Sequence, residues 1–90
     1  MDDVSLEDAR AAERSPHSAS ADELFHLGLL YSLGNDGPPD LVAAQMWLNL
    51  AAMKGSAPAR ICRRELAGEM TPAQLADAQR QAARWIAPHP

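Results

Sequence analysis

Aromatic and β-branched residues are scarce in this chain, and their scarcity excludes most β-rich architectures. Aromatic side chains make up only 4% of the residues, and valine, isoleucine and threonine are also few. Strands are normally enriched in these types because they pack well on a pleated surface. Alanine instead supplies much of the 47% apolar content, and it favours helix while filling little volume. The composition predicts closely packed helices.

Cysteine and long apolar runs are nearly absent as well. The single cysteine, Cys62, has no second cysteine with which to form an internal disulfide, which is typical of a reducing compartment. No segment approaches the ~20 continuous apolar residues of a membrane-spanning helix. A secretory signal begins with basic residues that an apolar segment follows, whereas the first residues of this chain are acidic. We therefore expect no secretory signal. These absences predict one cytoplasmic domain without membrane association.

Charge is distributed unevenly along the chain, whose formal net charge is −4. Residues 1–40 carry nine acidic and two basic side chains, whereas residues 54–90 carry six basic and three acidic ones. The arginines of the second part are Arg60, Arg63, Arg64, Arg80 and Arg84. They form a candidate site for weak binding of nucleic acid or an acidic peptide. A solvated basic face is the favoured interpretation, because an acidic chain binds nucleic acid poorly.

Two interpretations are open for residues 1–19, a flexible acidic segment or a short helix. The first strong helix signal follows this segment. Ser20 and Glu23 have the spacing of a capping box, which satisfies free amides at a helix start. Gly34 is a typical left-handed cap at a helix end. The pattern predicts a helix over residues 21–33.

A second helix is predicted over residues 41–54, after a turn that contains two prolines. Asp40 is a suitable N-cap for this helix, and Gly55 a suitable stop. Apolar side chains lie on two opposite faces of the segment, with few strongly polar residues between them. We therefore expect this helix to be packed between neighbours on both sides.

Two further helices are predicted in the rest of the chain. Ser56 or the turn after it begins the first, and its apolar stripe consists of Ala59, Cys62, Leu66 and Met70. Thr71 and Gln74 have capping-box spacing and begin the second, which ends before Pro88. Short turns between the helices predict antiparallel neighbours. The fold class predicted from these patterns is all-α.

Small, aromatic and capping residues between Leu27 and Ala59 form a pattern that resembles a known repeat. These residues are Leu27, Gly28, Tyr31, Gly34, Asp40, Ala44, Trp47, Ala51, Ala52, Gly55 and Ala59. Their spacing resembles the Sel-one-like repeat (SLR), a relative of the tetratricopeptide repeat. The resemblance implies that Gly28 and Ala44 let paired helices approach closely, and that Tyr31 and Trp47 fill the wedge between them.

The resemblance implies a right-handed α-α solenoid fragment made of two antiparallel hairpins. One full unit covers about residues 21–57, and a degenerate capping pair covers about residues 58–87. The chain departs from the family at Asp36-Gly37, where glycine and valine are usual. It also departs at Arg63-Arg64, where leucine and glycine would continue the next unit. We expect those arginines to face water.

The resemblance also implies a class of function. SLR proteins look like adaptors that assemble protein complexes, some of them in bacterial host and envelope processes, and they are typically not catalysts. The implied function is therefore non-catalytic binding of a peptide or partner helix, in a groove formed by the helix over residues 21–33. Candidate contact residues point away from its packing face: His26, Leu29, Ser32 and Leu33. Its apolar strip of Phe25, Leu29 and Leu33 is covered by the N-terminal segment, by a later helix or by another chain. Because isolated repeats bury little surface, homodimerisation through this helix is a further hypothesis.

Catalytic, cofactor and metal signatures are not evident in the sequence. The three histidines and Cys62 are not spaced as metal ligands, and no nucleophile–base set is apparent. The residual alternative is a small enzyme or ligand-binding domain that uses His26 and the Asn35-Asp36 turn. It requires a deep pocket beside His26, whereas an adaptor requires only an open groove.

Overall fold

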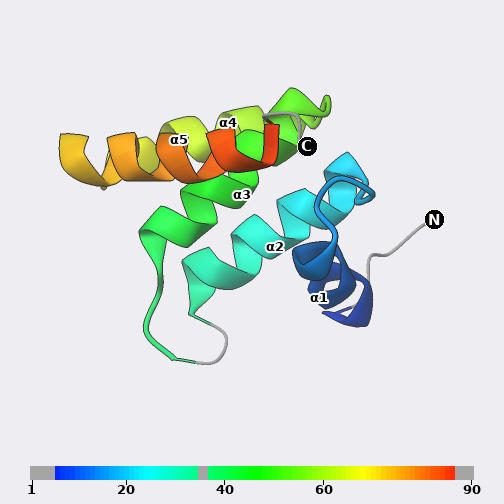
Figure 1. Ribbon diagram of the computed structural model, residues 1–90. Coiled ribbons are helices and arrows are strands. Elements are labelled where there is room, and N and C mark those ends of the chain that lie inside the picture. Colours follow the sequence, from blue (N-terminus) through cyan, green and yellow to red (C-terminus); the bar gives the residue numbers. More distant parts are fainter. Residues whose placement is uncertain (1–5, 35–36, 87–90) are drawn as a thin grey trace.

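The computed structural model describes residues 6–34 and 37–86, and in these ranges every regular element is an α-helix (Figure 1). The helices are α1 (Leu6–Arg14), α2 (Ala21–Leu33), α3 (Leu41–Met53), α4 (Ala57–Ala67) and α5 (Pro72–Ile86). The predicted all-α class is confirmed. Within the described ranges, each helix is too short or too polar to cross a bilayer.

A side-chain capping box begins α2 and a left-handed glycine ends it, as the sequence predicted. The Glu23 amide donates to Ser20 Oγ at 3.1 Å, and the Ser20 amide donates to Glu23 Oε1 at 2.8 Å. Gly34 ends the helix in the left-handed conformation, at φ 71° and ψ 51°. A residue without Cβ adopts this conformation at low cost, so the chain can turn sharply after α2.

The next helices begin at the residues expected from their capping signals. Asp40 accepts a hydrogen bond from the Ala43 amide at 3.0 Å, and the buried Ser56 hydroxyl accepts one from the Ala59 amide at 3.2 Å. At the start of α5, the amide of Thr71 and the side chain of Gln74 form one half of a capping box, at 2.9 Å. Local sequence chemistry therefore explains where the helices begin.

Helix α3 is the centre of the fold. It packs against α2, α4 and α5, whereas α1 packs against α2 (Figure 1). Seven of its residues are buried, which confirms that it lies between neighbours: Ala44, Gln45, Met46, Trp47, Leu48, Leu50 and Ala51. Helices α4 and α5 contact mainly α3 rather than each other.

Helices α2 and α3 approach each other closely at Gly28. A Cβ atom placed there would lie 2.6 Å from Leu48 Cδ2 and 3.3 Å from the Ala44 carbonyl oxygen. Leu48 is buried, with 2% of its surface exposed, and its side chain fills the space that a larger residue at position 28 would need. The small residue therefore permits the α2–α3 contact.

Arg63 was expected to face water, but the structure shows that it does not. It is half-buried, and its Nη1 donates to Asn49 Oδ1 of α3 at 3.4 Å. Its backbone carbonyl accepts a hydrogen bond from the buried Gln45 Nε2 at 3.0 Å. A long side chain with a polar tip can cover apolar surface and still reach a partner. Arg64 alone of the two arginines is exposed.

The segment between α1 and α2 is fixed to the far end of α3. Lys54 Nζ donates to the carbonyl oxygens of Pro16, His17 and Ala19, at 2.9, 3.0 and 2.6 Å. The His17 ring lies edge-on to Trp85 of α5, with ring centroids 5.8 Å apart. Of the two interpretations of residues 1–19, the described part is therefore a short helix with a docked connection.

Replacing Lys54 with methionine is expected to loosen this connection. Methionine keeps the length of the side chain but donates no hydrogen bond. Partly exposed, charge-assisted hydrogen bonds should together contribute about 1–2 kcal/mol to local stability. Hydrogen exchange measured by NMR at the Ser18 and Ala19 amides should therefore accelerate about five- to thirtyfold. Arg64→Met removes one exposed charge elsewhere and should leave both rates unchanged.

Candidate functional site

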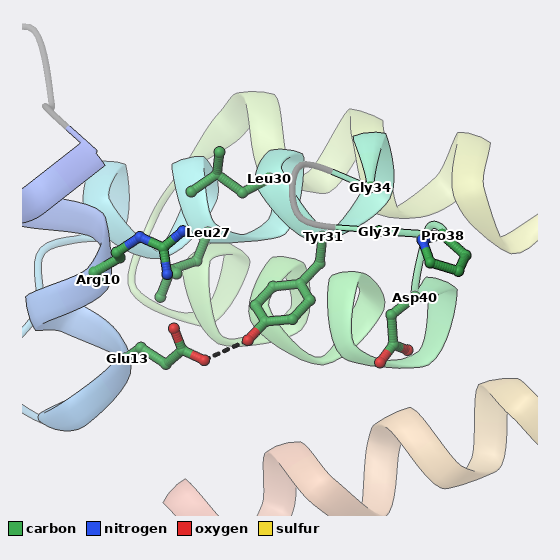
Figure 2. A pocket seen from close by; sticks show the side chains of 9 residues that line it. All are labelled: Arg10, Glu13, Leu27, Leu30, Tyr31, Gly34, Gly37, Pro38 and Asp40. Carbon is green, nitrogen blue, oxygen red and sulfur yellow. Dashed lines mark hydrogen bonds between the residues drawn. The ribbon is translucent and has the colours of Figure 1, made fainter.

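A cavity of about 280 Å³ lies between α1, α2 and the turn that leads to α3 (Figure 2). Its walls combine charged, aromatic and apolar side chains with two glycines. The lining residues are Arg10, Glu13, Leu27, Leu30, Tyr31, Gly34, Gly37, Pro38 and Asp40. All of them belong to the described part of the chain.

Helix α2 supplies one wall through Leu27, Leu30 and Tyr31, which are three and four residues apart and so share a face. Gly34 then turns the chain, and the Asp40 amide donates to the Tyr31 carbonyl oxygen at 3.0 Å. This backbone bond holds the returning chain against the end of α2. The turn therefore closes one end of the cavity.

Helix α1 supplies the opposite wall through Arg10 and Glu13, one helical turn apart. The Tyr31 hydroxyl donates a hydrogen bond to Glu13 Oε2, as Figure 2 shows. This bond joins α1 to α2 across the cavity. Glu13 is therefore both part of the wall and an anchor for α1.

The Tyr31 hydroxyl lies in a negative environment. Its hydrogen bond to Glu13, its partial burial and the charges of Glu13 and Asp40 raise the pKa of Tyr31 to about 12. Arg10 acts in the opposite direction but does not balance these effects. Removing the phenolic proton would place a third negative charge beside two carboxylates. At neutral pH Tyr31 is therefore a neutral hydrogen-bond donor.

This pKa predicts that Tyr31 loses its stabilising effect at high pH. The native hydroxyl holds its proton more tightly than an unfolded tyrosine of pKa 10. Between pH 10 and 12 the native state therefore binds more protons than the unfolded state. Stability should be intact below pH 10 and fall through that window. Because Tyr31 is only half-buried, solvent screening reduces the effect to about 1 kcal/mol.

Urea unfolding of wild type and Tyr31→Phe at a series of pH values measures this effect. The difference in unfolding free energy should be about 1 kcal/mol at pH 8 and should approach zero near pH 12. Every other side chain is common to the two proteins, so its contribution cancels in the difference. A difference that does not change with pH would contradict the raised pKa.

The predicted contact residues lie along α2 but do not line this cavity. Leu33 is exposed over 77% of its surface, whereas His26, Leu29 and Ser32 are partly exposed. His26 Nδ1 lies 2.7 Å from the Asp22 carbonyl oxygen, and Ser32 Oγ donates to the Leu29 carbonyl oxygen at 2.9 Å. Both polar side chains are thus engaged within their own helix.

The apolar strip of α2 is covered only in part. Phe25 packs against the core, but Leu33 at the other end of the strip is exposed. Helix α1 lies instead on the side that carries Leu27, Leu30 and Tyr31. The N-terminal segment therefore covers a different part of α2 from the one considered in the sequence analysis.

The residues of the repeat-like pattern divide between core and cavity. Six are buried, namely Leu27, Gly28, Ala44, Trp47, Ala51 and Ala59, while Ala52 is half-buried. Tyr31, Gly34 and Asp40 line the cavity together with the buried Leu27. Gly55 has a positive φ of 102° after α3. Tyr31 extends to Glu13 of α1, a contact that the expected wedge with Trp47 does not include.

Sequence reasoning missed Arg10 and Glu13 as parts of a site. Their spacing of three residues within a possible short helix was the available signal, because it places both on one face. That signal does not say which surface the helix will meet. The Tyr31–Glu13 bond, between residues 18 apart in the chain, supplies this information only in three dimensions.

Other candidate chemistry is dispersed. Within residues 6–34 and 37–86 no three His, Cys, Asp or Glu side chains are grouped to hold a metal ion. His26 does not line the cavity described above, and Asn35-Asp36 lies outside the described residues. The free Cys62 is half-buried. Four of the five arginines are exposed, and Arg80 pairs with Asp77 at 3.4 Å.

Comparisons with protein-family models, curated proteins and solved structures found no match to this chain.

Proposed function

We propose that this protein is a non-catalytic adaptor that binds a peptide or helix of a partner along α2. The carrying observation is the 77% exposure of Leu33, at the end of a helix whose other faces pack against α1 and α3. A large apolar side chain in water gains free energy when a partner covers it. Leu29 lies one turn earlier and extends the same surface.

The cavity adjoins this surface. Leu30 lines the cavity and precedes Leu33 by three residues, so the two side chains lie on neighbouring positions of α2. A partner that covers Leu33 can therefore also enter the cavity. An exposed apolar contact next to a mixed polar pocket is a common form of peptide recognition.

The likeness to the Sel-one-like repeat supports the same proposal. In this proposal α2 and α3 are one repeat hairpin, and α4 and α5 are a degenerate second pair stacked in a right-handed sense. The packing of α4 and α5 against α3 supports stacking of both helices on the first hairpin, although they contact each other little. Repeat units gain stability by covering their neighbours, so a second copy of the chain is one candidate partner.

Capture of partners from a lysate by wild type and by Leu29→Asp/Leu33→Asp tests the proposal. The amount of specific partner captured by the double variant should be at least about tenfold lower than with wild type, because an unpaired carboxylate at an apolar contact is costly. Ile61→Asp is a matched control, since Ile61 is 59% exposed on α4. It should capture the partner normally.

Circular dichroism must show that all three proteins are folded. Equal capture by folded wild type and folded double variant would contradict the proposed surface. Sedimentation of wild type at high concentration examines the homodimer separately. A particle of 9.7 kDa would exclude self-association as the source of burial.

A further inference from the structure

Two carboxylates from separate elements face the cavity between α1 and α2. Glu13 comes from α1, and Asp40 precedes α3. Asp40 Oδ1 accepts a hydrogen bond from the Ala43 amide, and Glu13 Oε2 accepts one from the Tyr31 hydroxyl. A carboxylate has about four lone-pair sites on its two oxygens, so each retains acceptor capacity toward a ligand.

The balance of charge in the cavity favours a cation. Among its described lining residues Glu13 and Asp40 are acidic and Arg10 is basic. The hydrogen bond to Glu13 and partial burial are the main causes of the raised pKa of Tyr31, and the charges of Glu13 and Asp40 add to it against the opposing charge of Arg10. A positively charged group close to the phenol would experience attraction from both carboxylates.

The size of the cavity and its apolar walls limit the ligand further. Its volume of about 280 Å³ is slightly below the ~300–1,000 Å³ of sites for drug-sized molecules. Leu27, Leu30 and Pro38 provide contact for methylene groups, and the Tyr31 ring is an aromatic surface. These features match a single long side chain with a charged end.

We propose that this cavity binds one arginine side chain of a partner peptide, with its guanidinium held by Glu13 and Asp40. Arginine fits better than lysine because its planar, permanently charged group binds carboxylates in bidentate geometry and stacks on aromatic rings. This inference rests on the adaptor proposal for its natural ligand. Its first test needs no partner, and so the two can fail independently.

The probe is N-acetyl-arginine methylamide, and N-acetyl-citrulline methylamide is its neutral isostere. NMR titration should show saturable shifts at Tyr31, Gly34 and Gly37 with the arginine compound. The citrulline compound should bind about three- to tenfold more weakly, because it has lost its charge. Shifts confined to other residues, or equal binding of the two compounds, would overturn the proposal.

Two substitutions remove charge while preserving local structure. Glu13→Gln keeps an acceptor for the Tyr31 hydroxyl, and Asp40→Asn keeps a good N-cap for α3. Each should weaken the arginine probe about three- to tenfold and leave the citrulline compound unaffected. A loss of fold in either variant would appear in the circular dichroism, and the other variant then carries the test.

Arg10 distinguishes a cation site from an anion site. Arg10→Gln should tighten the arginine probe about two- to fivefold, because it removes a like charge from the wall. If Arg10 instead recruits an acidic ligand, N-acetyl-glutamate methylamide will bind wild type better than the arginine compound. That result, or weaker arginine binding by Arg10→Gln, would overturn the proposal.

Discussion

Leu48→Ala is expected to lower the free energy of unfolding by about 3 kcal/mol, and Gly28→Ala by about 1–2 kcal/mol. The first substitution leaves a cavity where a leucine with 2% exposure fills the α2–α3 contact. The second introduces a Cβ 2.6 Å from Leu48 Cδ2. The gain of ~1 kcal/mol in helix propensity from glycine to alanine offsets part of that overpacking.

The two substitutions should compensate each other. In the Leu48→Ala background the Leu48 Cγ and Cδ2 atoms are gone, and the Ala44 carbonyl oxygen at 3.3 Å is a much milder contact. Gly28→Ala should therefore be neutral or stabilising there. The double variant should therefore be more stable than the sum of the single effects by about 1–2 kcal/mol. Urea unfolding followed by circular dichroism measures all four proteins of this cycle.

Gly68→Ala is a control for the general effect of replacing glycine. Gly68 ends α4 with φ −64°, a conformation open to alanine, and its new Cβ would lie 3.3 Å from the Glu65 carbonyl oxygen. Its stability should change by less than about 0.5 kcal/mol. Additive effects in the cycle would mean that the contact at Gly28 does not limit the approach of α2 to α3.

Helix ends were predictable because their chemistry is local. Ser20, Asp40 and Thr71 each cap a helix through an amide three residues ahead, and this spacing is legible in the sequence. Gly34 likewise marks the end of α2. The central position of α3 was predictable from its two apolar faces.

Contacts between distant segments were not predictable in the same way. Lys54 binds three backbone carbonyls near Pro16, and any residue type can present a carbonyl, so the sequence contains no signal for this partner. Arg63 was expected to face water, but its contact with Asn49 depends on how α4 lies against α3.

Only part of the candidate site was predictable from the sequence. Four lining residues were identified from the repeat-like pattern, although as structural residues rather than as walls of a cavity: Leu27, Tyr31, Gly34 and Asp40. Arg10 and Glu13 required the docking of α1, which has too few apolar residues to reveal its packing partner. A site formed between two helices is therefore harder to predict from the sequence than either helix alone.

Gly34→Ala should be the most damaging substitution in the turn, at about 3 kcal/mol or more. An alanine at φ 71° carries backbone strain of about 1 kcal/mol. Its Cβ would also lie 2.4 Å from the Gly37 carbonyl oxygen and 2.8 Å from the Pro39 nitrogen. These are backbone atoms, which cannot rotate away as a side chain can. The turn must therefore open, and with it the end wall of the cavity.

Gly55→Ala separates strain from collision. Gly55 also has a positive φ, 102°, but nothing lies within 4 Å of its added Cβ. It should lose only about 1–2 kcal/mol, because strain acts there alone. Urea unfolding gives both values, and NMR shifts at Gly37 report the turn directly. If the two variants lose equal stability, the contact of Gly34 with Gly37 and Pro39 contributes nothing, and the turn tolerates a side chain. If Gly34→Ala loses more stability and also shifts Gly37, the close packing of the turn is what holds this wall of the cavity in place.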